Sequence, residues 1–417
     1  MYMIIHNDVC AGSICHRLND TQHAQSGIIV SASQLRLPYD LLLYFEGNVI
    51  YMATIKDIAK NLGISPSTVS KGLNGASDIS ESLRAKVLET AVALGYRKPG
   101  MRSKSDRRIA IFVENMEYKE PSQFGYDILL GFRQIAFKEN YSVDIIEPDK
   151  DFQLKHKYDT FLMEHGYLGG FLAGFALDDP WMKEMSNVTM PAVLLDNYVT
   201  ANPHVGYIGT DSYEGIDMAI VHLIHLGHEK IAFLNGSKDS MISDQRMSAY
   251  LESMNSHNLH IDPNMAIYSY FVAEAAKYHV EHLIKLGATA IICGNDLIAK
   301  GVIATVKEYG FSVPEDISVI GFDDIPLASK LDPPLTTIRQ NRSELGKSAY
   351  FTLKAIINNI PMSKSMLRPS LVIRESTAEA KPRMVRAHEN DKDSVLSINP
   401  SLYANVVKNK LIKDSTL

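Results

Sequence analysis

Short hydrogen-bonding side chains and a lysine gather between positions 54 and 74 of the sequence. Hydroxyl and amide groups of this size bond to phosphate oxygens, and a lysine can donate to the acceptor atoms of guanine in the major groove. We expect Ser67 and Lys71 to reach base edges. The other members suit phosphate contacts, and they are Thr54, Ser65, Thr68, Ser70 and Asn74.

The charge of the chain is divided unevenly. The whole sequence has a net charge of −6, yet residues 52–108 carry eleven Lys and Arg against five Asp and Glu. That segment is therefore net +6, and the remainder is net −12. A basic block on an acidic body is expected where one part of a protein meets a polyanion, although a solvated basic face has the same composition.

Polar side chains also follow several short apolar runs further along the chain. Asp196 ends AVLLD, Asp323 follows SVIGF, and Asn295 follows AIICG. These groups accept or share hydroxyl hydrogens, and Arg246, beyond KIAFLNG, adds a planar fork of donors. Together they suit a polyol better than an apolar ligand. Each of these acids and amides, and Asp211 as well, could cap a helix instead of binding a ligand, because such residues at a strand end often cap the next helix.

The sequence contains no recognisable catalytic constellation. The adjacent pair Asp323–Asp324 invites an acid–base or metal interpretation, but neighbours on a strand point to opposite sides. Phosphate-binding, nucleotide-binding and nucleophile motifs are absent. His222, His225 and His228 could face one metal, but we interpret them as packing residues. We therefore expect no catalytic residue, no cofactor and no metal site.

Three short helices must position the first group of side chains. Ser and Thr caps followed by apolar periodicity predict them within residues 54–63, 65–74 and 80–95, with Pro66 in the first position of the second. Two short helices joined by a tight glycine turn and braced by a third form a helix-turn-helix. An ordinary three-helix bundle is the alternative.

Apolar runs and helical patterns alternate after Arg108. This order predicts parallel sheets with helices on both faces. The apolar runs are more numerous than the strands of one typical sheet, so we expect two lobes. The predicted strands lie at 109–113, 143–146, 169–174, 192–196, 230–236, 289–296 and 317–324. Helical patterns between them include 126–138, 215–226 and 297–309.

These patterns divide the chain into five parts. Residues 1–51 lack a sustained period, and we expect an upstream extension with the natural start at Met52. The other parts are a helix-turn-helix head at 52–97, a polar linker at 98–108, an effector-binding and dimerisation body at 109–377, and a tail at 378–417, which we expect to be disordered. Within the body, we expect lobe 1 at 109–209 and 341–366, and lobe 2 at 210–340 and 367–377.

Cysteine use and hydropathy narrow the class of protein. Cys10, Cys15 and Cys293 are too few and too unevenly spaced for a disulfide framework, and Cys293 lies in an apolar run typical of a core. No apolar run has the roughly 18 residues that a membrane-spanning helix requires, and the first residues lack a secretory signal pattern. We therefore expect a cytoplasmic protein without a membrane partner.

The segment ATIKDIAKNLGISPSTVSKGLNGASDISESLRAKVLETAVALGYR closely resembles the DNA-binding domain of the lactose-repressor (LacI) family. The elements I-x-D-I-A, S-x-x-T-V-S and L-G-Y carry the resemblance, which implies that Pro66, Ser67 and Lys71 are the base readers. Proline offers no side-chain donor, so this chain departs from members with a polar residue there. The residues expected to contact DNA are Thr54, Ile55, Ser65, Pro66, Ser67, Thr68, Ser70, Lys71 and Asn74.

The linker departs from the family pattern. Members of the family usually follow the head with a hinge helix that inserts a leucine into the minor groove. The segment RKPGMRSKSDRR is short, contains Pro99-Gly100 and has no leucine, so Met101 is its one candidate wedge. A basic arm that binds phosphates without kinking the duplex is the alternative, and we favour it.

Residues 108–377 resemble the family's core, which has the fold of periplasmic sugar-binding proteins and binds ligands between two lobes. The stretches that carry this resemblance are HLGHEKIAFLNG, GNDLIAKG, VPEDISVIGFDDIPLASKLDPPLTTIRQ and LVIREST. It implies that Arg246, Asn295 and Asp323 bind the effector, with Asp196 as a weaker match and Tyr270 or Phe271 as an aromatic face for a sugar ring. Phe124, Tyr126 and Tyr213 could line the cleft or simply pack.

The resemblance implies a function. We expect a homodimeric repressor that binds double-stranded operator DNA and is switched by a small polar effector, most simply a carbohydrate that acts as an inducer. The alternative from another class is a sugar-binding protein or sugar-converting enzyme without a DNA function. The sequence has no leucine-heptad tail for tetramer formation, which favours dimers.

Overall fold

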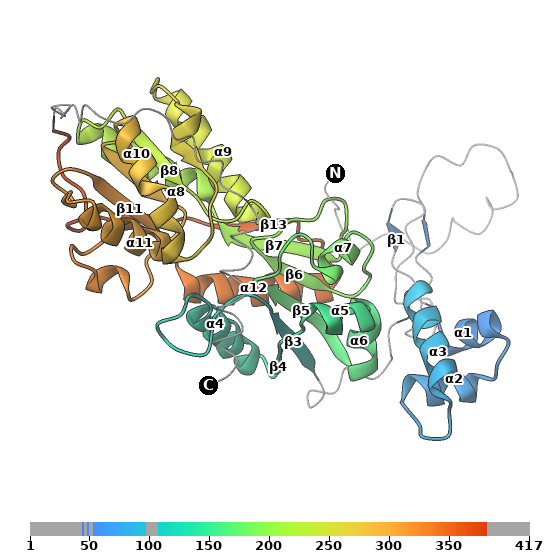
Figure 1. Ribbon diagram of the computed structural model, residues 1–417. Coiled ribbons are helices and arrows are strands. Elements are labelled where there is room, and N and C mark those ends of the chain that lie inside the picture. Colours follow the sequence, from blue (N-terminus) through green and yellow to red (C-terminus); the bar gives the residue numbers. More distant parts are fainter. Residues whose placement is uncertain (1–43, 46–47, 50–52, 97–106, 382–417) are drawn as a thin grey trace, which may run out of the picture. The chain divides into compact units, whose positions relative to one another are not determined.

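The computed structural model describes residues 44–45, 48–49, 53–96 and 107–381. It separates into two compact units, Met1–Met101 and Arg102–Leu417 (Figure 1). Strands β1 (Tyr44–Phe45) and β2 (Asn48–Val49) pair antiparallel in the first unit. The predicted start at Met52, the choice between a hinge helix and a basic arm, and residues 382–417 of the tail lie outside the described residues.

Three helices form the head, as the capping pattern predicts: α1 (Ile55–Leu62), α2 (Pro66–Leu73) and α3 (Glu81–Ala93). A reciprocal capping box begins α1, because Asp57 N donates to Thr54 Oγ1 over 3.4 Å and Thr54 N donates to Asp57 Oδ2 over 2.8 Å. Gly63 ends α1 in the left-handed region with φ of 66°. The three-helix head is thereby confirmed.

A small apolar core fixes the helices of the head to one another. Ile58, Val69 and Val87 are completely buried, one from each helix. A Cβ on Gly72 would lie only 3.0 Å from Val87 Cγ1, so α2 approaches α3 closely at that point. The packing leaves the opposite side of α2 in solvent.

Lobe 1 of the second unit contains a six-stranded sheet in which every neighbouring pair is parallel. Its strand order is β13-β7-β6-β5-β3-β4. The bounds are β3 (Arg108–Val113), β4 (Ser142–Ile146), β5 (Tyr167–Ala173), β6 (Ala192–Leu195), β7 (Val205–Thr210) and β13 (Lys364–Leu367).

Lobe 2 contains the second six-stranded sheet, with the order β14-β12-β11-β10-β8-β9. All of its pairs are parallel except β14 with β12. The bounds are β8 (Ile231–Leu234), β9 (Ala266–Ile267), β10 (Ala290–Cys293), β11 (Ser318–Asp323), β12 (Thr336–Arg339) and β14 (Ser370–Val372).

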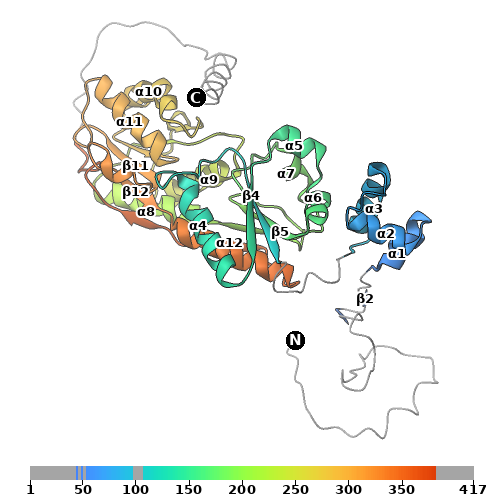
Figure 2. The same cartoon turned by 90° about the horizontal axis from the view of Figure 1, so that it is seen from below.

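Helices cover both faces of each sheet, so each lobe has two apolar cores (Figures 1 and 2). In lobe 1 they are α4 (Phe124–Lys138) and α12 (Arg342–Ile357) on one face, and α5 (Lys150–Lys155), α6 (Tyr158–His165) and α7 (Pro180–Glu184) on the other. In lobe 2 they are α8 (Ser212–His225) and α9 (Met241–Ser256) on one face, and α10 (Val280–Leu286) and α11 (Asp296–Glu308) on the other.

Short 3-10 helices complete the described elements: Pro263–Met265, Ala273–Tyr278 and Ala328–Lys330. None of the helices in the described part of the chain is long and apolar enough to cross a membrane. The two-lobed α/β architecture predicted from alternating apolar runs is confirmed.

The chain crosses between the lobes three times, from β7 to α8, from β12 to α12, and from β13 to β14. Parallel strands in both lobes put polar residues at their carboxyl ends close to these crossings. Residues 378–381, at the start of the predicted tail, are described, and Ala380 N donates to Leu226 O over 2.8 Å.

Helices α4 and α12 cross at two glycines. A Cβ on Gly346 would lie 1.8 Å from Ile128 O, and a Cβ on Gly131 would lie 2.2 Å from Ser343 O. Only glycine permits this approach, because real Cβ atoms do not occur that close to backbone oxygens. The crossing therefore fixes the start of α12 against α4.

Gly346→Ala is expected to lower the free energy of unfolding by about 3 kcal/mol, because the added methyl group must force the two helices apart. Urea unfolding can be followed by the fluorescence of Trp181, which is the only tryptophan and is fully buried in lobe 1. Lys347→Ala on the same helix removes only a partly exposed ion pair and should cost less than about 1 kcal/mol. Equal losses in the two variants would show that the crossing tolerates a side chain.

Candidate nucleic-acid interface and ligand cleft

Helix α2 is divided into a buried and an exposed side. Val69, Gly72 and Leu73 are buried, whereas Ser67 and Lys71 are exposed. The other predicted DNA contacts are exposed or half-buried, and they are Thr54, Ile55, Ser65, Pro66, Thr68, Ser70 and Asn74. The structure thus places the predicted set on the solvent side of the head, at and around one helix.

Several of these polar groups already serve the ends of α2. Ser65 Oγ accepts from Thr68 N over 3.1 Å and lies 2.7 Å from Ser67 Oγ. Asn74 Nδ2 donates to Ser70 O over 2.8 Å. Ser65 and Asn74 therefore have structural roles in the described head, and Ser67 is held beside the cap.

Lys71 forms an ion pair with Asp78, in the loop between α2 and α3. The bond from Lys71 lowers the pKa of Asp78 below its ordinary value. Both side chains are more than half exposed, and an exposed ion pair is worth at most about 1 kcal/mol, so the pair leaves Lys71 available to another partner. Sequence analysis missed Asp78, because nothing in its spacing marks it as a neighbour of Lys71.

Arg246 is the centre of the second site. It lies on α9, is 3% exposed, and its Nη1 donates to Gly294 O over 2.5 Å. Its guanidinium stacks 3.8 Å from the centre of the Phe322 ring, and Nη2 lies 3.8 Å from Asp323 Oδ1. A buried guanidinium held on three sides cannot reorient freely, which makes it a fixed donor for a ligand.

Two carboxylates from different lobes share the field of Arg246. Asp196 follows β6 of lobe 1, and Asp323 ends β11 of lobe 2. Burial raises the pKa of each to about 6, the charge of Arg246 opposes that rise, and Asp323 raises the pKa of Asp196 further. Their φ angles of 57° and 112° lie in a region that costs non-glycine residues about 1–3 kcal/mol and is common at functional sites.

Buried polar atoms without a protein partner are concentrated in this region. Within the described residues they include one atom each of the two central groups, Asp196 Oδ1 and Arg246 Nε. Buried polar groups are normally hydrogen-bonded, so the set indicates a place where solvent or a polar ligand binds. Further members from the same crossings are Thr210 Oγ1, Ser212 Oγ and Gln340 Oε1.

Gln340 and Tyr207 belong to the site but were missed by sequence analysis. Gln340 Nε2 donates to Asp323 Oδ1 over 2.7 Å. Tyr207 Oη and Asp196 Oδ1 both flank Gly209, where a Cβ would lie 2.1 Å and 2.8 Å from them. Tyr207 also donates to Gln245 Oε1 of α9 over 3.4 Å, which links lobe 1 to lobe 2. Their positions depend on contacts distant in sequence, so no local signal identifies them.

Asn295 and Asp211 take the capping roles that were left open. Asn295 Oδ1 accepts from Ile298 N over 2.8 Å, and Asp211 Oδ1 accepts from Glu214 N over 3.0 Å. Asp324, the neighbour of Asp323, is bound by Arg339 and Arg374, each over 2.6 Å. The adjacent acids therefore have different partners, although Asp324 lies just beyond β11 rather than on the strand.

The aromatic candidates differ in position. The ring of Phe271 covers Gly236 just after β8, since a Cβ on that glycine would lie 2.1 Å from Phe271 Cζ. Tyr270 is 37% exposed. Phe124 and Tyr126 are half-buried near the start of α4, and Tyr213 lines a pocket of about 370 Å³ beside α9. Of Tyr270 and Phe271, Phe271 is therefore the residue whose ring covers the end of a strand.

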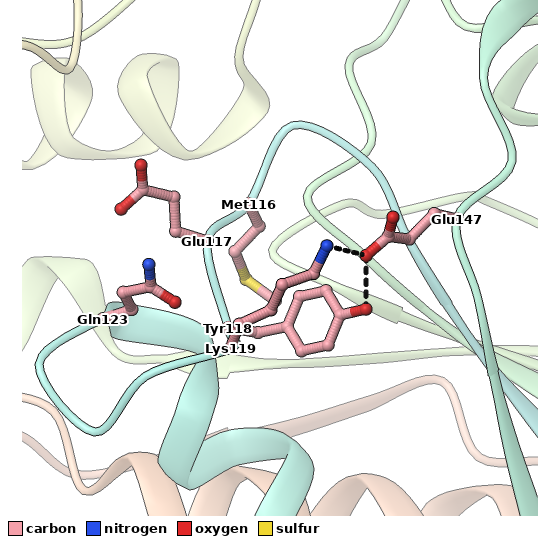
Figure 3. Close-up of a pocket in the computed structure, with 6 residues that line it drawn as sticks. All are labelled: Met116, Glu117, Tyr118, Lys119, Gln123 and Glu147. Atoms are coloured by element: carbon pink, nitrogen blue, oxygen red, sulfur yellow. Dashed lines mark hydrogen bonds and ion pairs between the residues drawn. The ribbon is translucent and has the colours of Figure 1, made fainter. Parts of the chain in front are cut away.

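A pocket of about 200 Å³ lies on lobe 1 beyond β3 and β4 (Figure 3). Figure 3 shows Tyr118 and Lys119 directed toward Glu147, which accepts from Tyr118 Oη over 2.5 Å and pairs with Lys119 Nζ over 3.0 Å. These bonds lower the pKa of Glu147. The remaining lining residues are Met116, Glu117 and Gln123.

Two of the three histidines at positions 222, 225 and 228 bond to residues of their own lobe. His228 Nδ1 lies 2.9 Å from Thr289 Oγ1, and its Nε2 lies 3.0 Å from Ser318 Oγ. His222 Nε2 lies 3.0 Å from Thr377 Oγ1. Among the residues that the structure describes, no group of His, Cys, Asp and Glu is arranged to hold a metal ion.

Comparisons with known proteins agree with both halves of this description. The model of the bacterial regulatory proteins of the lacI family matches residues 54–98, and that of the periplasmic binding protein-like domain matches residues 220–377. The HTH-type transcriptional repressor PurR of Aliivibrio salmonicida is 28% identical over 334 residues, which cover 78% of this chain and 99% of the relative.

Two further proteins match over a similar length. The ribose operon repressor of Haemophilus influenzae is 29% identical over 78% of this chain and 98% of its own length. The solved complex of the transcriptional regulator CelR with cellobiose has a TM-score of 0.58 at 23% identity and covers 78% of this chain and 99% of that chain. With a helix-turn-helix head, a two-lobed body and relatives matched over nearly their whole length, the chain combines a DNA-binding domain of the lacI family of bacterial regulatory proteins with a periplasmic binding protein-like domain, and its homologues are transcriptional regulators.

Proposed function

We propose that this chain is a repressor that binds operator DNA through α2 and releases it when a sugar binds in the cleft around Arg246. One arrangement carries the proposal. The same chain holds a head that exposes Ser67 and Lys71 and a buried cluster in which Asp196 and Asp323 approach Arg246 from two lobes. Because the bacterial chromosome lies in the cytoplasm, we place the protein there.

On the DNA side, α2 enters the major groove with Ser67 and Lys71 toward the bases. Pro66 contributes shape but no donor. Thr54, Ser65, Thr68, Ser70 and Asn74 lie around these two residues and supply phosphate contacts, assisted by the helix N-termini. Ile55, at the start of α1, packs against the DNA backbone.

On the effector side, the fixed donors and acceptors suit the hydroxyls of a carbohydrate. Arg246 donates through Nε, and Asp196 accepts at Oδ1, since both atoms lack a protein partner. Asn295 and Asp323 contribute the remaining polar surface, and Tyr270 or Phe271 covers the ring. The names of the ribose operon repressor and of the cellobiose complex of CelR support a sugar as the ligand class.

The mechanism is thermodynamic linkage in a homodimer. Two heads bind two half-sites, and a sugar that binds more tightly to one arrangement of the lobes shifts the dimer away from the DNA-binding arrangement. A coupling free energy of about 1–3 kcal/mol would change operator affinity roughly 5–150-fold. The named relatives are regulators, and Asp324 is held in ion pairs, so no observation favours catalysis.

A gel-shift assay of the full chain on DNA from upstream of its own coding sequence tests the proposal. We expect a salt-sensitive complex that exceeds binding to random duplex and dissociates on addition of a sugar from a carbohydrate panel. Binding without any sequence preference, with and without every sugar, would overturn the DNA-binding half.

Lys71→Ala should weaken binding to the preferred duplex by about 1–3 kcal/mol, because it removes a base contact. Fluorescence anisotropy on preferred and random duplexes measures the loss on each. Lys86→Ala, an exposed lysine of the bracing helix α3, is the matched control and should change neither affinity by much. A loss that is equal on both duplexes would assign Lys71 to phosphate rather than to a base.

Arg246→Ala should leave operator affinity unchanged and abolish the response to the sugar, because the central donor of the cleft is lost. The same anisotropy titration, repeated with the sugar that dissociates the wild-type complex, provides the readout. Arg368→Ala removes an arginine whose side chain is 87% exposed and should respond as the wild type does. A retained response in Arg246→Ala would exclude Arg246 from the site.

Sugar affinity should fall as the pH drops below about 6, because Asp196 and Asp323 have pKa values of about 6 and accept hydroxyl hydrogens more strongly as carboxylates than as neutral carboxyl groups. The loss has an upper bound of about tenfold per pH unit for each acid. Burial raises these values, so the same protonation stabilises the empty protein as the pH falls. Calorimetric titration at pH 7.5, 6 and 5 measures the affinity, and a constant value would contradict the proposed role of the acids.

A further inference from the structure

Arg342, the first residue of α12, has a buried guanidinium in which one nitrogen has no hydrogen-bond partner. The residue is 9% exposed, and its Nη2 donates to Asp127 Oδ2 of α4 over 2.9 Å. Its Nη1 is buried and has no hydrogen-bond partner. Leaving a buried charged donor unsatisfied is costly, so this atom indicates a partner that the protein alone does not supply.

The crossing from β12 to α12 brings Arg342 close to Asp323 and so to the cluster around Arg246. Gln340 donates to Asp323 through Nε2 over 2.7 Å, and Arg342 N donates back to Gln340 O over 2.9 Å. Burial raises the pKa of Asp323, and the charge of Arg342, like that of Arg246, opposes that rise, so the guanidinium lies within electrostatic reach of that carboxylate. Gln340 Oε1 and Arg342 Nη1 are thus two unpartnered polar atoms on one short segment beside Asp323.

An entirely structural role accounts for only part of this geometry. The pair with Asp127 ties α12 to α4, and it uses Nη2 alone. Arg339, three residues earlier, shows how an arginine with a structural role behaves here, because its Nε binds Asp324 and its side chain is 51% exposed. Arg342 differs in being buried and in retaining a free donor.

The charges around Arg246 and Arg342 identify the class of ligand. Asp127, Asp196 and Asp323 contribute three carboxylates, whereas Arg246 and Arg342 contribute two guanidinium groups. Asp296, buried behind Asp323, is a further acid whose pKa is raised by burial and by Asp323. The site therefore has no surplus positive charge for a carboxylate or phosphate, and its free donor suits a neutral oxygen.

We propose that Arg342 is an effector-binding residue whose Nη1 donates to a hydroxyl or ring oxygen of an uncharged polyol. This inference rests on the proposed effector function. It restricts the ligand to neutral sugars and excludes sugar acids and sugar phosphates. Because Nη2 of the same guanidinium holds Asp127 on α4, the ligand and that helix share one rigid group.

Isothermal titration calorimetry of the full chain tests the inference with ribose, glucose and cellobiose as neutral probes and gluconate, glucuronate and glucose 6-phosphate as charged probes. We expect at least one neutral probe to bind and the charged probes to bind more weakly. Arg342→Gln should weaken the neutral probe about 10- to 100-fold, because a bond from a charged donor is lost. Arg339→Gln, the matched control, should change it less than about twofold.

Deoxy analogues of the bound sugar separate ligand contact from a structural role. In the wild type, removing the hydroxyl that Nη1 binds should cost about as much as Arg342→Gln does. In Arg342→Gln, removing that hydroxyl should cost nothing further, because both changes delete the same bond. If the ring oxygen is the acceptor, the carbocyclic analogue shows this pattern instead. A structural role would leave every analogue's relative affinity unchanged.

Each outcome decides a separate point. Neutral probes that bind equally well to the wild type and Arg342→Gln would overturn the inference but not the proposed function. Tighter binding of a charged probe would overturn the ligand class, and failure of every neutral probe would overturn both the class and the sugar response. If thermal unfolding shows that Arg342→Gln is not folded, Arg342→Lys, which keeps the charge but offers a single nitrogen, should show the same loss.

Discussion

The buried charge of Arg246 is the constraint on which the cleft depends. A guanidinium that is 3% exposed must be compensated, and its compensation comes from Gly294, Phe322 and Asp323, with Asp196 contributing from the other lobe. Those partners stand at the carboxyl ends of parallel strands from two separate sheets. The lobes must therefore keep a defined relation for the charge to remain paired, and a ligand that enters among these groups acts on that relation.

Much of the fold follows from local signals in the sequence. The caps at Thr54, Ser65 and Ser80 act within one helical turn, so their positions are readable without knowing what packs against them. Apolar runs such as AVLL of β6 and AIIC of β10 are strands buried on both faces, which is why they are uninterrupted. Strand ends then indicate Asp196 and Asp323, since ligands of parallel sheets bind at that edge.

The residues missed by sequence analysis are positioned by distant contacts. Asp78 meets Lys71 only after the loop between α2 and α3 folds back, and Tyr207 meets Asp196 across neighbouring strands. Arg342 is positioned by the α4–α12 crossing, which two glycines permit. Asn295 shows a different limit of sequence analysis, because its residue type suits both a ligand contact and a helix cap. In the structure its Oδ1 caps α11.

Reciprocal linkage provides the most direct test of the central claim, that one ligand-dependent arrangement of the lobes controls DNA binding. The dissociation constant of the sugar would be measured with and without a duplex that this chain selects from random sequences, and that of the duplex with and without the sugar. The account predicts that both constants change by the same factor, between about 5 and 150. A sugar affinity that is identical in the presence and absence of saturating duplex would contradict it.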